Sequence, residues 1–153
     1  MPSRRAIRPR EKPVRIITLK VKANESAVSD SLQNLRTGLA ESGLEAETLG
    51  RVEIALAEVL NNITEHGQAE TGVDTVRLSA RISDQDIRVE IRDSGTAVPE
   101  VCLNSAHLPD NSGPLHSLPE GGFGWYLIHN MVDDLRYSQE HGENQLELVF
   151  HRA

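Results

Sequence analysis

Two periodicities of hydrophobic residues divide most of the chain into strands and helices. Segments in which apolar and polar residues alternate predict amphipathic strands, and segments in which apolar residues return every three or four positions predict helices. Gly43 and Gly67 are the last residues of the two earliest helical segments, where glycine commonly ends a helix. The predicted strands are 13–23, 73–82, 86–93, 135–141 and 144–152, and the predicted helices are 24–43, 44–67 and 123–134.

The order of these elements predicts the fold class. A short Ser-Asp-Gln turn separates the second and third strands, which favours an antiparallel hairpin. Residues 94–121 are rich in Gly, Pro, Ser and Asn and have no periodicity, and so long a loop is commonly functional, often as a lid. We therefore expect one α+β domain over residues 13–153, a two-layer sandwich with helices on one face of a mixed, mostly antiparallel sheet.

Composition limits the classes of protein to consider. The chain has 153 residues, of which 38% are hydrophobic and 25% charged, as in an ordinary globular domain. The apolar stretches are too short to span a bilayer, and no secretory signal is visible. The single cysteine, Cys102, excludes an internal disulfide and favours a reducing compartment. We therefore expect a cytoplasmic protein with no membrane contact.

Charge is unevenly distributed along the chain. Residues 1–22 hold eight basic residues and one acidic residue, although the formal net charge of the whole chain is −7. A basic arm on an acidic body can bind nucleic acid or an acidic partner. We favour the simpler interpretation that residues 1–12 are a disordered terminus, because no aromatic residues are interleaved there. No direct nucleic-acid partner is predicted.

A glycine cluster opens the last predicted helix, in the stretch EGGFGWYLIHNMVDDL over residues 120–135. Gly121, Gly122 and Gly124 allow the backbone to approach an anion closely. The helix N-terminus adds unpaired N–H groups and a positive dipole end. The cluster therefore indicates a phosphate site or, more simply, an ordinary turn. It is not a P-loop, because no Gly-Lys-Ser/Thr follows.

Two further positions carry candidate chemistry. Glu58 and Asn62 are four residues apart, so they share one face of the long helix, on the flank of its apolar stripe. An Asn carbonyl suits Mg²⁺, and a carboxylate one turn earlier can accept a proton; an exposed polar flank is the alternative. Asp93 ends a strand before Ser-Gly, where it can accept a hydrogen bond from an exocyclic amine or simply form a turn.

Taken together and in this order, the motifs resemble the GHKL (Bergerat-fold) ATPase superfamily, which includes gyrase, mismatch-repair ATPases and histidine kinases. Within it, the chain is most similar to the small bacterial anti-sigma factors that are serine-protein kinases. EIALAEVLNNITEHG resembles the N-box, with Glu58, Asn62 and His66 in register, and RDSGTAV resembles the first glycine box. EGGFGWYLIHNMVDDLRY resembles the second glycine box, and GENQL the strand that closes the adenine pocket.

The resemblance implies a function for each matching residue. Asn62 would ligate Mg²⁺, and Glu58 would be the general base toward a substrate serine. Asp93 would bind the adenine amine, and Gly95 would let the chain pass close to the base. The remaining nucleotide-binding positions would be His66 and Ala97, the phosphate-wrapping residues Gly121, Gly122, Phe123 and Gly124, and Asn144 on the adenine side.

The resemblance also implies cofactors and partners: ATP with Mg²⁺, a homodimer, a sequestered sigma factor, and an anti-anti-sigma protein of the STAS type that is phosphorylated. The sequence departs from the family pattern at Ala97, usually glycine, and at Glu120, where many relatives have arginine. The expected lid contains no Lys or Arg.

Three functions remain open from the sequence. The first is a serine-protein kinase that acts by partner switching. The second is a non-catalytic nucleotide-binding module that sequesters a partner, which the cation-free lid favours. The third, the ATPase half of a histidine kinase, is disfavoured because no dimerisation helix pair precedes residue 14.

Overall fold

The computed structural model describes residues 14–66, 75–104 and 122–152. Within them, five strands form one sheet in the order β1-β2-β3-β5-β4, and each neighbouring pair is antiparallel. The predicted hairpin between the second and third strands is confirmed. The strands are β1 (Arg15–Lys22), β2 (Thr75–Ile82), β3 (Asp86–Asp93), β4 (Asp134–Glu140) and β5 (Glu143–His151).

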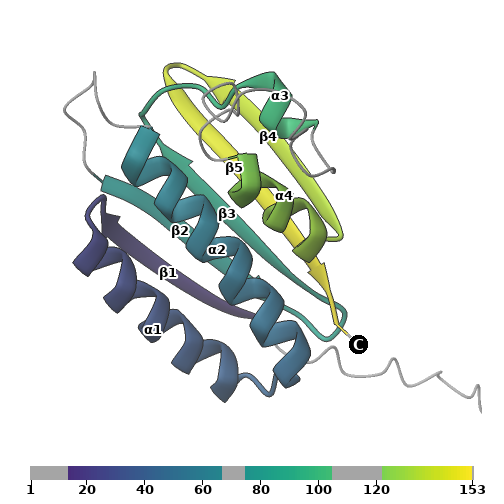
Figure 1. Cartoon of the computed structure of the whole chain (residues 1–153). Coiled ribbons are helices and arrows are strands. Elements are labelled where there is room, and N and C mark those ends of the chain that lie inside the picture. Colours follow the sequence, from purple (N-terminus) through teal and green to yellow (C-terminus); the bar gives the residue numbers. More distant parts are fainter. Residues whose placement is uncertain (1–13, 67–74, 105–121, 153) are drawn as a thin grey trace, which may run out of the picture.

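The helices cover one face of this sheet, as the element order predicts. Figure 1 shows α1 (Glu25–Glu41) beside β1, α2 (Ala46–His66) across the middle of the sheet, and α4 (Gly122–Met131) toward β5. Asn24 caps α1 by accepting a hydrogen bond from the N–H of Ala27, and Gly43 follows the helix with a φ of +76°. The two-layer α+β sandwich is confirmed.

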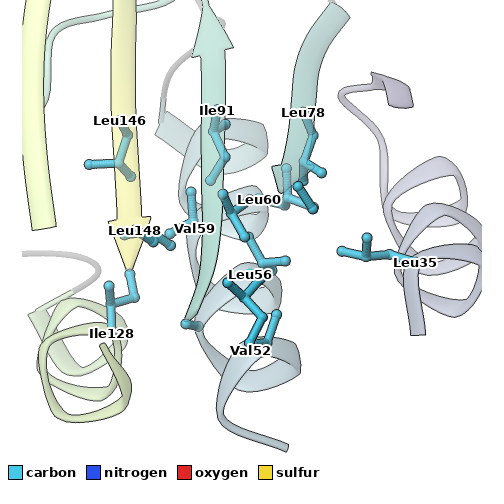
Figure 2. Packing of buried hydrophobic residues seen from close by; sticks show 14 of the residues in the cluster. Leu35, Val52, Leu56, Val59, Leu60, Leu78, Ile91, Ile128, Leu146 and Leu148 are labelled. Atoms are coloured by element: carbon cyan, nitrogen blue, oxygen red, sulfur yellow. The ribbon is translucent and has the colours of Figure 1, made fainter. Parts of the chain in front are cut away.

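Alternating burial along the strands places the core between the two layers. The buried residues of α2 include Val52, Leu56, Val59 and Leu60, most of its predicted apolar stripe. Figure 2 shows Leu60 close to Ile91 and Leu78 of the sheet, and Val59 close to Leu148 of β5, while Ile128 of α4 also lies beside Leu148. Burying a large aliphatic side chain contributes about 1.5–3 kcal/mol, so this face of α2 holds the helix in one rotational setting.

Most boundaries agree with the predicted ones to within two residues, and two differences are larger. Residues 100–103, inside the segment predicted to be a structureless loop, form the short helix α3 (Glu100–Leu103). The last helix ends at Met131 rather than at residue 134, because the N–H of Asp133 bonds to the carbonyl of Val149 in β5. The predicted arm, residues 1–12, and most of the predicted lid, residues 105–121, lie outside the described residues.

A polar junction joins α2, α4 and the end of β5. The Asp133 carboxylate accepts hydrogen bonds from the backbone N–H of His151 at 2.6 Å and from Nη1 of Arg51 at 3.2 Å. Arg51 also donates to the carbonyls of Met131 and His151. The His151 N–H, followed by Arg51, holds the pKa of Asp133 below its usual range. Among the described residues, no helix is long and apolar enough to cross a bilayer.

We predict that Asp133→Asn lowers the free energy of unfolding by about 1 kcal/mol at pH 7, because the charge-assisted hydrogen bonds at the junction weaken. A carboxyl group whose folded pKa is depressed stabilises the protein above its unfolded pKa of about 3.9. That contribution is lost as the pH falls through the lower, folded pKa. The difference between wild type and variant should therefore persist at neutral pH and shrink below about pH 4, in urea unfolding measured across this range.

The neighbouring residue Asp134 supplies a control. Its ion pair with Arg136, at 3.2 Å, lies on the surface, and exposed pairs contribute about 0–1 kcal/mol. Asp134→Asn should lower the free energy of unfolding by less than Asp133→Asn does at pH 7. Equal losses from the two variants would contradict the importance of the junction.

Candidate functional site

A cavity of about 160 Å³ lies between the C-terminal half of α2, the start of α4, the end of β3 and the start of β5. Its walls are mainly apolar, as in sites that hold the flat part of a small ligand. Asp93 and Asn144 are its buried polar residues, and Asn62 lies at its α2 side. The remaining lining residues are Val59, Ile63, Thr96, Ala97, Val98, Pro99, Cys102, Trp125, Tyr137 and Leu146.

Asp93 is a buried carboxylate whose hydrogen bonds are one-sided. Its Oδ1 accepts from the N–H of Gly95 at 2.9 Å and from Nδ2 of Asn144 at 3.1 Å. The hydrogen bonds that the described residues give to Asp93 all end on Oδ1. Oδ2 therefore remains as an acceptor, because a carboxylate has two lone pairs on each oxygen, and Asp93 lines the cavity.

Asn144 organises the chain after β3. Its Nδ2 also donates to the carbonyl oxygens of Gly95 and Thr96, each at 3.0 Å. Its Oδ1 accepts a hydrogen bond of 2.6 Å from the hydroxyl of Tyr137, and that hydroxyl in turn accepts from the N–H of Val98 at 3.0 Å. One connected network thus joins β3, β4, β5 and the segment after β3.

Glu58 and Asn62 meet the first turn of α4. A Cβ atom placed on Gly124 would lie 2.7 Å from Oε2 of Glu58, and 3.5 and 3.7 Å from Nδ2 and Oδ1 of Asn62. Only a residue without a side chain allows the helix to approach the carboxylate this closely. The structure thus brings the N-box pair and Gly124 together, although more than sixty positions separate them in the sequence.

The residues present fit an adenine nucleotide. Asp93 offers a free acceptor at the inner end of an apolar cavity, as an exocyclic amine requires. Nδ2 of Asn62 is buried and has no partner within the described part of the chain. Leaving such a donor unsatisfied costs about 1–3 kcal/mol, so a ligand that carries a hydrogen-bond acceptor is expected to use it. The described residues hold no cluster of three or more His, Cys, Asp or Glu that could bind a metal ion.

The predicted site residues are only partly covered by the structure. Gly95 is buried beside Asp93, whereas Ala97 lies at the surface of the cavity. Gly122 begins α4, and Phe123 is half exposed. Gly121 and the side chain of His66 lie outside the described residues.

Sequence reasoning missed several residues of the cavity. Tyr137 was predicted only as part of a strand, although its hydroxyl reaches Asn144. Trp125 and Cys102 line the cavity, and His129 joins α4 to α3 through a 2.8 Å contact between its Nε2 and the carbonyl oxygen of Cys102. Burial raises the pKa of the Cys102 thiol, which opposes a nucleophilic function. The alternation of β4 could have placed Tyr137 on the inner face.

Comparison with known proteins shows the family to which the chain belongs. Residues 21–150 match the sequence model of the histidine kinase-like ATPase domain. The chain belongs to this family. The serine-protein kinase RsbW of Bacillus cereus is 30% identical over 108 residues, which cover 70% of this chain and 64% of that protein. RsbW of Oceanobacillus iheyensis is 24% identical over 132 residues, which cover 82% of this chain and 80% of that protein.

Solved structures show the same fold. The RsbU and RsbW domains of a Mycobacterium tuberculosis protein superpose with a TM-score of 0.64 at 18% identity, over 90% of this chain and 32% of that one. The histidine kinase domain of a blue-light activated kinase from Erythrobacter litoralis superposes with a TM-score of 0.51 at 18% identity, over 85% of this chain and 64% of that one. This ATPase-type domain is therefore an α+β sandwich of the GHKL type.

We predict that Gly124→Ala moves the Glu58 carboxylate without unfolding this domain. The new Cβ would collide with Oε2, the mobile end of a side chain, while its distances to Asn62 are ordinary contacts. Replacing a glycine inside a helix by alanine also stabilises the folded protein by about 0.5–1 kcal/mol. This gain offsets the energy needed to move Glu58 to another rotamer. A crystal structure of the variant should show Glu58 rotated away from α4 and Asn62 in place.

Gly50→Ala provides the matched control, because Gly50 lies in α2 and a Cβ added there would meet no atom within 4 Å. This variant should leave Glu58 unmoved and should be as stable as the wild type or slightly more so. A Gly124→Ala structure with Glu58 in its original position would contradict the close-packing interpretation.

Proposed function

We propose that this domain is an ATP-dependent serine-protein kinase of the anti-sigma type, which transfers the γ-phosphoryl group of ATP to a serine of an anti-anti-sigma protein. The observation that carries the proposal is the convergence of Glu58 and Asn62 with Gly124, with Asn62 also lining the cavity that contains Asp93. The relatives named serine-protein kinases support the activity at the level of the family.

In this proposal, the inner end of the cavity selects the base. Oδ2 of Asp93 would accept a hydrogen bond from the adenine amine, while Asn144 and the N–H of Gly95 hold Oδ1 in place. The apolar side chains of Val59 and Leu146 would enclose the ring and exclude water. Recognition through one unpaired acceptor favours a base that carries an amine over one that carries a carbonyl at the same position.

The outer end of the cavity would carry out the transfer. Bound Mg-ATP would supply the phosphoryl group and the charge neutralisation that phosphoryl transfer requires. Asn62 would hold the Mg²⁺ ion through its side-chain oxygen, and the first turn of α4 would face the phosphates with its unpaired N–H groups. Glu58 would accept the proton of the serine hydroxyl, whose oxygen forms the new bond to phosphorus as ADP leaves.

The proposed partners follow from the family resemblance. The protein would sequester a sigma factor, release it on partner switching, and phosphorylate a STAS-type anti-anti-sigma protein. It would act in the cytoplasm as a homodimer. Identifying both protein partners requires co-purification from the native cell.

We predict that Glu58→Gln reduces phosphoserine formation by about 10²–10⁴-fold while the affinity for Mg-ATP changes little, because the amide keeps the size of the carboxylate but cannot accept the proton. The measurement is single-turnover transfer from labelled ATP to the anti-anti-sigma protein, with ATP affinity determined by calorimetry. Glu53→Gln is the control, since Glu53 lies on the same helix but forms a surface ion pair with Arg36 at 3.0 Å. Transfer by Glu58→Gln at the wild-type rate would refute the assignment of Glu58.

The non-catalytic alternative keeps one specific observation in its favour. No Lys or Arg lines the cavity in the described residues, and residues 94–121 contain none in the sequence. Such cations commonly stabilise the charge that develops in phosphoryl transfer. If the wild type binds both ATP and its partner but forms no phosphoserine, this nucleotide-dependent binding module is the better account.

A further inference from the structure

We propose that Tyr137 is a positioning residue that determines the selectivity of the cavity for its base; this inference rests on the proposed binding of ATP. The Tyr137 hydroxyl donates to Oδ1 of Asn144 at 2.6 Å and accepts from the N–H of Val98 at 3.0 Å. It is thus satisfied as both donor and acceptor, and each partner belongs to a different wall of the cavity.

The position of Tyr137 follows from strand register. Leu146 of β5 lies opposite Tyr137, and Asn144 is two residues earlier on the same inward face. Such diagonal neighbours are within reach of an aromatic side chain. The ring of Tyr137 lines the cavity, and its hydroxyl extends to Asn144 at the inner end.

The hydroxyl determines how Asn144 is used. With Oδ1 occupied by Tyr137, the amide group Nδ2 faces three acceptors: Oδ1 of Asp93 and the carbonyls of Gly95 and Thr96. Asn144 is only 2% exposed, so water has little access to replace a lost partner. Removing the hydroxyl would orphan the Asn144 oxygen and the Val98 N–H together.

The position of Asn144 also affects Asp93. Asn144 and Gly95 occupy Oδ1 and leave Oδ2 for the ligand, so the direction of this free oxygen depends on the position of Asn144. Tyr137 touches the base only as part of the cavity wall. Its hydroxyl acts on selectivity through Asn144 and Asp93, and through Val98 it holds the chain that follows β3.

The test compares Tyr137→Phe with Tyr126→Phe, because these two are the chain's only tyrosines. Tyr126 lies on α4 and is not among the cavity-lining residues. The dissociation constants of Mg-ATP and Mg-ITP are measured by calorimetry for wild type and both variants. Inosine lacks the exocyclic amine and carries a carbonyl in its place. Unfolding midpoints establish that each variant is folded at the temperature of titration.

The expected result is that Tyr137→Phe weakens ATP binding by about tenfold and narrows the preference for ATP over ITP, whereas Tyr126→Phe changes neither. Unchanged ATP affinity in Tyr137→Phe would overturn the inference. Equal weakening of ATP and ITP would also overturn it, because a purely structural tyrosine affects both ligands alike. A wild type that binds no ATP would refute the proposed function itself, and is thereby distinguished from either result.

Discussion

The burial of one face of α2 against the sheet is the constraint on which the site depends. Val52, Leu56 and Val59 are almost fully buried, so α2 has a single rotational setting above the strands. This setting turns Glu58 and Asn62 toward α4 rather than toward solvent. Gly124 then completes the arrangement, since a side chain there would occupy the space of the carboxylate. Core packing and site geometry are therefore consequences of the same helix orientation.

A buried carboxylate is the second organising feature. Moving a charge out of water costs several kcal/mol unless hydrogen bonds or opposite charges compensate. For Asp93 the compensation comes from Asn144 and Gly95 and is confined to Oδ1. One carboxylate oxygen is thus held by hydrogen bonds and the other is available to a ligand, which is the arrangement expected of a group that recognises a ligand. Tyr137 in turn holds Asn144 in place, because its hydroxyl donates a hydrogen bond to Oδ1 of Asn144.

Much of this could be predicted from the sequence, and the exceptions have physical reasons. Periodicity placed the strands and long helices, and motif spacing brought Glu58, Asn62 and Asp93 forward as candidates; the functions of these residues remain predictions. Helix α3 was missed because four residues are too few to show a period. The end of α4 was misplaced because Asp133 bonds across to β5, a contact that local pattern does not contain. Tyr137 was missed because its importance lies in a cross-strand hydrogen bond.

Recognition of an amine-bearing base by Asp93 can be tested by calorimetric titration of Asp93→Asn with Mg-ATP. Asparagine can keep its Oδ1 hydrogen bonds to Asn144 and Gly95 and should preserve the fold, while an amide donor replaces the free acceptor. We expect the affinity for ATP to fall at least about tenfold relative to the wild type, and the affinity for ITP to fall less. Equal affinity of wild type and variant for ATP would contradict it.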